Sequence, residues 1–181
     1  MVGACIAVWV FARRNNCSLL TALDICSPGG AIGVCFGRIA NFIQPELWGR
    51  PTNVPWAMVF PGAGSLPRHP SQIYEAVLEG LVVFVILRFA IRGGALKRPG
   101  LLIGLFGLSY GVARILCEFF KAPDPDLFSF SFVTMGMLLS LPMVAVGALV
   151  IALTSYRHRV PRINEQRNAY GSGRSDGHRG L

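Results

Sequence analysis

The sequence has few charged residues. Asp, Glu, Lys and Arg make up 14% of its 181 residues, whereas soluble globular domains carry roughly 25%. Hydrophobic residues make up 52%, which excludes an intrinsically disordered chain, a collagen-like repeat and a small disulfide scaffold. Acidic residues are scarcest, since 9 Asp and Glu oppose 17 Lys and Arg. Beside long apolar runs, the net charge of +8 indicates a membrane protein with basic loops and no nucleic-acid partner.

Cysteine motifs are missing as well. The five cysteines form no CxxC pair, so the sequence predicts no metal site and no cofactor. We expect reduced thiols buried among apolar side chains. No basic segment precedes the first apolar run, so no cleavable signal peptide is predicted.

Long apolar runs predict an all-α, polytopic integral membrane helix bundle. A helix needs about 20 apolar residues to cross a hydrocarbon core of about 30 Å. Three segments meet that requirement: residues 73–89, 101–120 and 132–153. Residues 1–12 are apolar but short and predict a partial span. Residues 19–36 contain Asp24 and a Ser-Pro-Gly-Gly breaker, which predicts a kinked or broken helix. The expected total is about five spans, the first partial and the second broken.

Basic residues predict the orientation of these spans, because Lys and Arg concentrate on the cytoplasmic side. With five spans, the basic clusters at residues 13–14, 88–98 and 157–179 fall on one side. The C-terminus is therefore expected in the cytoplasm. The loop at residues 39–71 is expected outside, and its two Trp residues favour an ordered segment at the membrane interface.

The same patterns divide the chain into two parts. Residues 1–157 are expected to form the transmembrane domain. Residues 158–181 are rich in Gly, Arg, Ser and Asn, which predicts a basic, disordered cytoplasmic tail attracted to anionic membrane lipids.

Some basic residues lie on the side that this orientation disfavours: Arg38, Arg50, Arg68, Arg114 and Lys121. Topology does not account for them, so they are the first indication of a functional site. Three polar clusters contain them.

The first cluster occupies residues 37–52. Arg38 and Asn41 are three residues apart, so they share a face if the helix continues. A guanidinium beside an amide suits a phosphate, because its planar fork binds two oxygens. Glu46 adds a carboxylate. The alternative is an arginine that only marks the membrane edge.

The second cluster begins at Arg68 and His69 and continues through Tyr74, Glu75 and Glu79. Glu79 lies inside an apolar run, and an intramembrane carboxylate is a functional candidate that is usually paired with a cation. His69 is a candidate general base near neutral pH. The alternative for His69 is an ordinary surface residue.

The third cluster is a polar stripe on an apolar helix: Tyr110, Arg114, Glu118 and Lys121. The alternative is an Arg114–Glu118 pair that only joins helices. Translocon scales give a cost of roughly 2.5–3.5 kcal/mol for each charge at mid-membrane, whereas an intrahelical pair returns at most about 0.5 kcal/mol in water. Joining helices is thus a poor explanation. Glycines on the same segment predict close approach of another helix.

Together the three clusters resemble prolipoprotein diacylglyceryl transferase, an integral-membrane enzyme of bacteria. Residues 37–52 are similar to the signature segment of that family, and residues 67–75 and 110–118 are similar to two further blocks in the same order. The resemblance covers about residues 2–157.

The resemblance implies a phosphatidylglycerol--prolipoprotein diacylglyceryl transferase of the bacterial inner membrane. Such an enzyme moves the diacylglyceryl group of phosphatidylglycerol to the lipobox cysteine thiol beside a prolipoprotein signal peptide, and a thioether forms. Arg38 matches the arginine that engages phosphatidylglycerol, with Asn41 and Glu46 as its polar companions. Arg114 matches the second essential arginine, with Glu118 beside it. The accessory candidates are Arg68, His69, Tyr74 and Glu75.

The sequence departs from the family pattern at several positions. Ala40 stands where glycine is usual, Gln44-Pro45 where Asn-Gly is usual, and Lys121 replaces an arginine. The family's earlier spans and its catalytic His-Gly-Gly histidine are expected before Met1, and His69 does not match that histidine. We therefore expect the chain alone to be inactive. Two alternatives stay open: a transporter or channel for an anionic solute, and a non-catalytic truncated remnant of the transferase.

Overall fold

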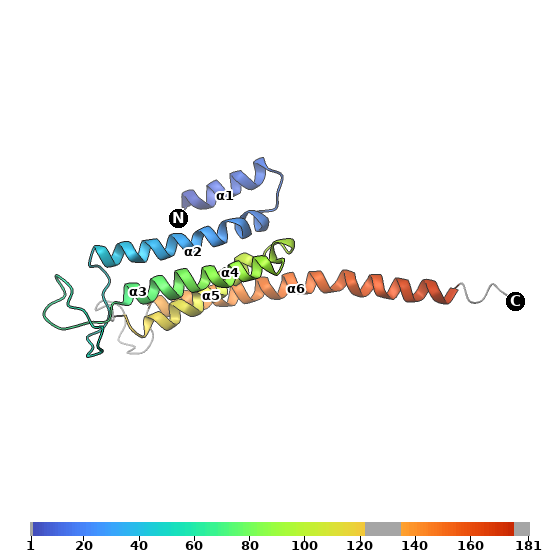
Figure 1. Cartoon of the computed structure of the whole chain (residues 1–181). Coiled ribbons are helices and arrows are strands. Elements are labelled where there is room, and N and C mark those ends of the chain that lie inside the picture. Colours follow the sequence, from blue (N-terminus) through green and yellow to red (C-terminus); the bar gives the residue numbers. More distant parts are fainter. Residues whose placement is uncertain (1, 122–134, 176–181) are drawn as a thin grey trace.

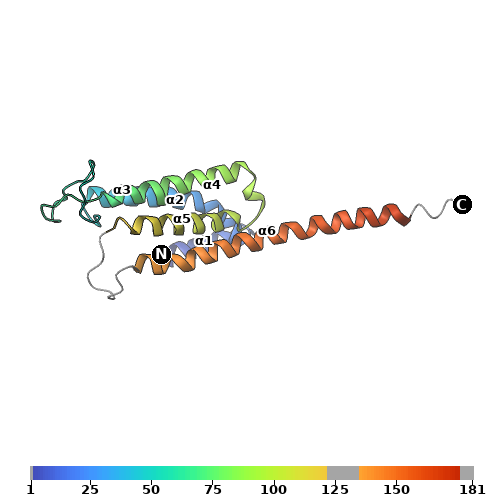
Figure 2. The same cartoon turned by 90° about the horizontal axis from the view of Figure 1, so that it is seen from below.

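The protein is a bundle of helices, and the computed structural model describes residues 2–121 and 135–175. In chain order the helices are α1 (Val2–Arg14), α2 (Leu19–Ile43), α3 (Ser71–Glu75), the π-helix η1 (Ala76–Val82), α4 (Val83–Arg92), the 3-10 helix η2 (Ala95–Lys97), α5 (Leu101–Glu118) and α6 (Met135–Ser175). Helices α2 to α6 lie side by side, and α1 packs against α2 (Figures 1 and 2). The described residues contain no β-strand, only isolated bridges.

Three helices are long and apolar enough to cross a membrane: Leu19–Ile43, Leu101–Glu118 and Gly136–Arg157. In addition, α3, η1 and α4 join into one helical run over residues 71–92. The prediction of an all-α membrane helix bundle is confirmed. The total of five spans stays a prediction, and residues 132–134 of the last predicted span lie outside the described residues.

Side-chain burial has the distribution expected of a membrane protein. Large apolar side chains such as Phe36, Phe89 and Leu139 are exposed on the bundle surface. Several polar side chains are buried instead: Asp24, Ser71, Gln72, Glu75, Glu79 and Glu118. Because lipid solvates apolar groups and excludes polar ones, polar residues of a membrane helix face the bundle interior.

Helix α2 is continuous from Leu19 to Ile43, so the second span is not broken, and a kink at Pro28 stays a prediction. Pro28 lies inside the helix and removes one backbone N–H from its hydrogen-bond ladder. Contacts with neighbouring helices allow membrane helices to tolerate such a loss. Here α2 packs against η1 and α5.

Asp24, which contributed to the prediction of a kinked or broken second span, connects α2 to α5. Its carboxylate is 1% exposed and accepts hydrogen bonds from the backbone N–H groups of Gly100 (2.7 Å) and Ile103 (2.8 Å). These donors lie at the start of α5, where backbone N–H groups have no partner within the helix. Asp24 therefore caps α5 from a neighbouring helix.

Glycines allow α5 and α6 to pack closely, as the sequence predicts. A Cβ atom on Gly111 would lie 2.6 Å from a Val144 methyl carbon, and one on Gly147 would lie 2.6 Å from the backbone nitrogen of Leu108. Any larger residue at these positions would push the two helices apart.

Residues 44–70 form an ordered loop at one end of the bundle. The backbones of Met58 and Arg68 exchange two hydrogen bonds, at 3.0 and 2.8 Å. Gly49 donates to the carbonyl of His69 at 3.0 Å. Ser71 does not cap α3 through its side chain; its hydroxyl donates to the carbonyl of Leu47 and so fastens the loop to α3.

Helix α6 continues to Ser175 and projects beyond the bundle (Figure 1). The sequence predicts a disordered tail from residue 158, and the structure is helical there as far as it is described. Residues 176–181 lie outside the described residues, and the division of the chain at residue 157 stays a prediction.

Candidate functional site

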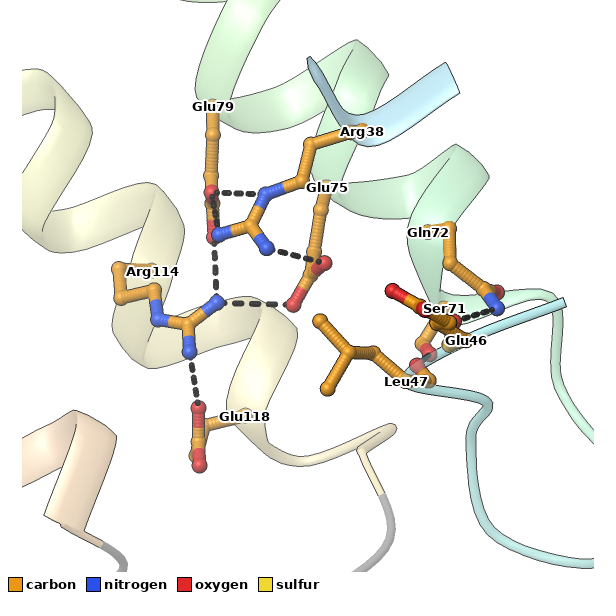
Figure 3. A network of polar contacts seen from close by, with 9 residues as sticks. All are labelled: Arg38, Glu46, Leu47, Ser71, Gln72, Glu75, Glu79, Arg114 and Glu118. Carbon is orange, nitrogen blue, oxygen red and sulfur yellow. Dashed lines mark hydrogen bonds and ion pairs between the residues drawn. The ribbon is translucent and has the colours of Figure 1, made fainter. Parts of the chain in front are cut away.

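Charged side chains from three parts of the chain meet at the loop end of the bundle (Figure 3). Helix α2 supplies Arg38, α3 and η1 supply Glu75 and Glu79, and α5 supplies Arg114 and Glu118. We call these five residues the charged network. The sequence predicts four of them as site or accessory residues, and the structure brings those four together.

Arg38 binds both carboxylates of the adjacent helical run. Its Nε and Nη2 atoms donate to Oε2 of Glu79 at 3.2 and 2.9 Å. Its Nη1 atom lies 3.1 Å from Oε2 of Glu75. One guanidinium therefore connects two carboxylates that lie one helical turn apart.

Arg114 approaches the same carboxylates from α5. Its Nη1 atom donates to Oε1 of Glu75 at 2.8 Å and to Oε1 of Glu79 at 3.2 Å. Its Nη2 atom lies 3.5 Å from Oε2 of Glu118, four residues later on α5. The Arg114–Glu118 pair predicted from the sequence is present, as one edge of a larger network.

The four ion pairs among Arg38, Glu79, Arg114 and Glu75 close a ring of alternating charge. The Glu79 and Glu75 side chains are 0% and 1% exposed, while those of Arg38 and Arg114 are 17% and 15% exposed. Attraction between charges is stronger in such surroundings than in water. Removing one partner from a buried pair is correspondingly costly.

A π-helical segment and a glycine bring Glu79 to this position. Glu79 lies in η1, and single π-helical turns are frequent at functional sites. A Cβ atom on Gly80 would lie 2.5 Å from the Cβ atom of Cys35. Helices α2 and η1 thus touch backbone to backbone, which places Arg38 beside Glu79.

Two predicted site residues lie outside the network. The Glu46 side chain is exposed, and its backbone carbonyl accepts a hydrogen bond from the Gln72 amide. Asn41 accepts from the backbone N–H of Glu46 through its own backbone carbonyl. Asn41 lies in the last turn of α2, and Glu46 lies near the start of the loop, where Figure 3 shows it beside the network.

The accessory candidates of the loop form a second group. Arg68 donates to the backbone carbonyls of Gly49 and Ala63, so it braces the loop. The Tyr74 hydroxyl accepts from the Trp56 indole at 2.6 Å and lies 3.2 Å from Nδ1 of His69. This group fixes the loop against α3, one residue before Glu75.

The sequence indicates Glu79 as an intramembrane carboxylate but does not predict the role it has here, at the centre of the network. Its position in an apolar run was the available signal, since such carboxylates are usually functional and paired. Its two arginine partners lie 41 and 35 residues away in sequence, and helical periodicity does not predict contacts at that range. Gln72 was also missed.

The network is suited to charge stabilisation. Two guanidinium groups held on helices apolar enough to cross a membrane can stabilise negative charge that develops on a ligand. Within the described part of the chain, no group of three His, Cys, Asp or Glu residues is arranged to hold a metal ion.

Comparisons with known proteins agree with this chemistry. The family model described as prolipoprotein diacylglyceryl transferase matches residues 1–153. The phosphatidylglycerol--prolipoprotein diacylglyceryl transferase of Methylocella silvestris is 59% identical over 162 residues, which cover 89% of this chain and 60% of the relative. Proteins of the same name from Beijerinckia indica and Rhodopseudomonas palustris are 57% and 58% identical, over 83% and 87% of this chain and 56% of each relative. The chain thus spans less than two thirds of the length of these relatives.

Proposed function

Because the chain belongs to the prolipoprotein diacylglyceryl transferase family, we propose that it takes part in diacylglyceryl transfer from phosphatidylglycerol to prolipoproteins. The observation that carries the proposal is the pair of arginines, Arg38 and Arg114, held together by shared carboxylates on two helices apolar enough to cross a membrane. The acceptor is the lipobox cysteine next to a prolipoprotein signal peptide. Residues 1–157 form the transferase domain, and residues 158–181 form its tail.

In this reaction a carbon–sulfur bond forms to the diacylglyceryl group, and the carbon–oxygen bond to the phosphate breaks. The electron pair of that bond leaves with glycerol phosphate, so negative charge develops on the phosphate oxygens. Arg38 and Arg114 stabilise this charge from a fixed position, which requires little reorganisation during the reaction. Glu118 holds Arg114 through the ion pair to Nη2.

The acceptor thiol must lose its proton to a base. Glu46 and Asn41 lie on the segment beside the network and are the candidates to contact the peptide. The loop is kept against α3 by residues outside the charged network: His69, Tyr74 and Arg68. Glu75 is shared by both arginines and keeps them close together.

A transfer assay tests the proposal. The chain would be co-expressed with the part of the Methylocella silvestris relative that it does not match, in a strain depleted of its own transferase. Membranes would be supplied with phosphatidylglycerol and a lipobox peptide. We expect thioether product from the unchanged chain and from Arg92→Lys, which lies at the far end of α4, and no product from Arg38→Lys. Product from Arg38→Lys at the unchanged rate would overturn the role of Arg38, and an inactive unchanged chain would overturn the proposed activity.

We also propose an inner-membrane location with the loop outside and the C-terminus in the cytoplasm. Single cysteines would be introduced as Ser65→Cys and Ser172→Cys after replacement of the native cysteines by serine. A membrane-impermeant maleimide should label position 65 in intact cells and position 172 only after permeabilisation. The reverse pattern would contradict the orientation.

A further inference from the structure

The turn that follows α2 has a backbone conformation that its residues disfavour. Leu47 has a φ angle of +56°. This left-handed conformation is costly for leucine, because its Cβ atom comes too close to the following carbonyl oxygen. Such strained residues persist where the surrounding structure fixes them, and they cluster at active sites and ligand clamps. The contacts that fix Leu47 therefore indicate what the turn does.

Two consecutive side chains of α3 fix this turn (Figure 3). The Ser71 hydroxyl donates to the carbonyl of Leu47 at 3.0 Å, and the Gln72 amide donates to the carbonyl of Glu46. Ser71 and Gln72 are both 0% exposed. From the other side, the carbonyl of Asn41 in α2 accepts a hydrogen bond from the backbone N–H of Glu46 at 3.0 Å. We call Glu46 and Leu47 the clamped turn, because two helices hold its backbone.

The clamped turn and the charged network are built on the same helical run. Gln72 and Glu75 are three residues apart, which places them on one face of the run, and both are buried. Their separation along the helix axis is about 4.5 Å. The clamped turn therefore lies about one helical turn from the carboxylate that binds both arginines, on the side of the loop (Figure 3).

The side chains of the clamped turn, unlike its backbone, are available to a ligand. Leu47 is 47% exposed. The Glu46 side chain is exposed as well, and within the described part of the chain its carboxylate has no ion pair or hydrogen bond. A carboxylate repels a lipid phosphate, so the turn suits the other substrate of the transferase. A signal peptide supplies an apolar segment, and the acceptor cysteine beside it supplies a thiol proton.

We propose that the clamped turn is a docking element for the acceptor peptide, with Leu47 in contact with apolar side chains of the peptide, and that Ser71 and Gln72 are the positioning residues which hold it. The inference rests on the proposed function and deepens it, because it assigns the two substrates to different side chains. The peptide binds at the clamped turn, and the lipid phosphate binds at Arg38 and Arg114.

Gln72 offers a substitution that removes one hydrogen bond of the clamp with little change in packing. Its Oε1 atom is buried and has no hydrogen-bond partner among the described residues, so the amide nitrogen alone contributes to the clamp. Gln72→Met keeps the length of the side chain and removes both polar atoms. A buried oxygen without a partner is itself unfavourable, and its removal offsets part of the lost hydrogen bond. We therefore expect the variant to fold.

Binding of the acceptor peptide is the first measurement. The chain would be purified together with the co-expressed part of the Methylocella silvestris relative, and a fluorescent lipobox peptide would be titrated into this preparation in detergent. We expect the dissociation constant of the peptide to rise about tenfold in Gln72→Met, since small displacements in a site have effects of this size or larger. The dissociation constant of dioctanoyl phosphatidylglycerol, measured by calorimetry, should not change. A general loss of structure would weaken both, so equal effects on the two substrates, or no effect on the peptide, would overturn the inference.

Leu47→Ala tests the apolar side chain separately from the clamp. Alanine also carries a Cβ atom, so the strain of the left-handed conformation stays and the apolar contact alone is lost. We expect the dissociation constant of the peptide to rise about tenfold, as burial of a few methyl and methylene groups implies. Leu47→Met should restore most of the affinity. Leu66→Ala, at another exposed leucine of the same loop, is the matched control and should bind the peptide as the unchanged chain does.

Each outcome of these titrations decides for or against the docking element. Unchanged peptide affinity in Leu47→Ala, or an equal loss in Leu66→Ala, would overturn the inference, and this pair decides alone if Gln72→Met does not fold. Absence of peptide binding by the unchanged preparation would overturn it too. Peptide binding without diacylglyceryl transfer would instead count only against the proposed function.

Discussion

Both ends of the bundle bury carboxylates, but the partners of these carboxylates differ in kind. At one end, Asp24 accepts hydrogen bonds from two backbone N–H groups of α5. At the other end, Glu75 and Glu79 face arginine side chains. The two ends are about 27 Å apart along the 18 residues of α5. Backbone donors are held by the helix itself, whereas side chains can exchange one anion for another.

This difference separates a structural carboxylate from a functional one. Asp24 stabilises the start of α5, and its hydrogen bonds among the described residues come from backbone N–H groups. The charged network, in contrast, holds two arginine side chains that are partly exposed. Burial alone therefore does not distinguish the two ends, whereas the kind of partner does.

The largest expected effect comes from Arg114→Lys. Arg114 contacts all three carboxylates of the network, and a lysine keeps the charge but loses the planar fork. We expect diacylglyceryl transfer to fall about 100-fold or more, since small misplacements of charge in a site have effects of that size. Arg92→Lys is the matched control, with an unchanged rate in the co-expression assay. If Arg114→Lys lowered the rate of diacylglyceryl transfer less than about threefold, the charged network would not differ in function from the Asp24 end of the bundle.

Gly80→Ala tests the close approach of helices that assembles the network. The new methyl group would lie within 2.5 Å of Cys35, so α2 and η1 must separate. We expect a loss of about 1–3 kcal/mol in the free energy of unfolding and weaker binding of phosphatidylglycerol. Gly33→Ala, in open space on the facing helix α2, serves as the control: it should leave lipid binding unchanged and raise the free energy of unfolding by up to about 1 kcal/mol through helix propensity. Equal behaviour of the two variants in thermal unfolding and lipid titration would contradict the packing argument.

Asp24→Asn tests whether the carboxylate at the opposite end of the bundle has only a structural role. An amide supplies one oxygen acceptor where the carboxylate supplies two, so one N–H group at the start of α5 loses its partner. We expect a loss of about 1–3 kcal/mol of stability and a phosphatidylglycerol affinity within twofold of the original. In the described part of the chain, the hydroxyl of Ser109 bonds to carbonyls of its own helix. Ser109→Ala therefore serves as the control, with a small effect expected. A large loss of affinity in Asp24→Asn at preserved stability would place Asp24 in the site.

The smallest effect is expected from Trp56→Phe. This change removes the hydrogen bond from the indole to the Tyr74 hydroxyl at a half-exposed position of the loop. The expected cost is about 0.5–1.5 kcal/mol of stability, with transfer activity reduced less than threefold. Trp9→Phe, on α1 at the far end of the bundle, should leave the loop unaffected. Loss of activity as severe as that of Arg114→Lys would show that the loop takes part in the chemistry.

Local patterns in the sequence predicted the local features of the fold. The i, i+4 spacing of Arg114 and Glu118 predicted their ion pair, which is present at 3.5 Å. The glycines of α5 predicted close packing with another helix, and α6 occupies that position. Such features depend on residues of one helix, so periodicity is sufficient to find them.

Features that depend on packing between helices were less predictable. The pairing of Glu79 with Arg38 joins residues 41 apart in sequence, and it arises from the contact of Gly80 with α2. Pro28 was interpreted as a break in α2 because its neighbours were unknown. In the bundle, α2 continues through Pro28 and packs against η1 and α5.

Photo-crosslinking of the lipid tests most directly that the charged network, and not the opposite end, receives the lipid phosphate. A phosphatidylglycerol analogue with a photoreactive group on its headgroup would be irradiated with the chain in detergent, and the modified peptides would be located by mass spectrometry. The account predicts crosslinks on residues 38–46, 71–79 and 110–118, and their loss in Arg38→Lys. Crosslinks confined to the basic end of the bundle, around Arg13, Arg98 and Arg157, would contradict it.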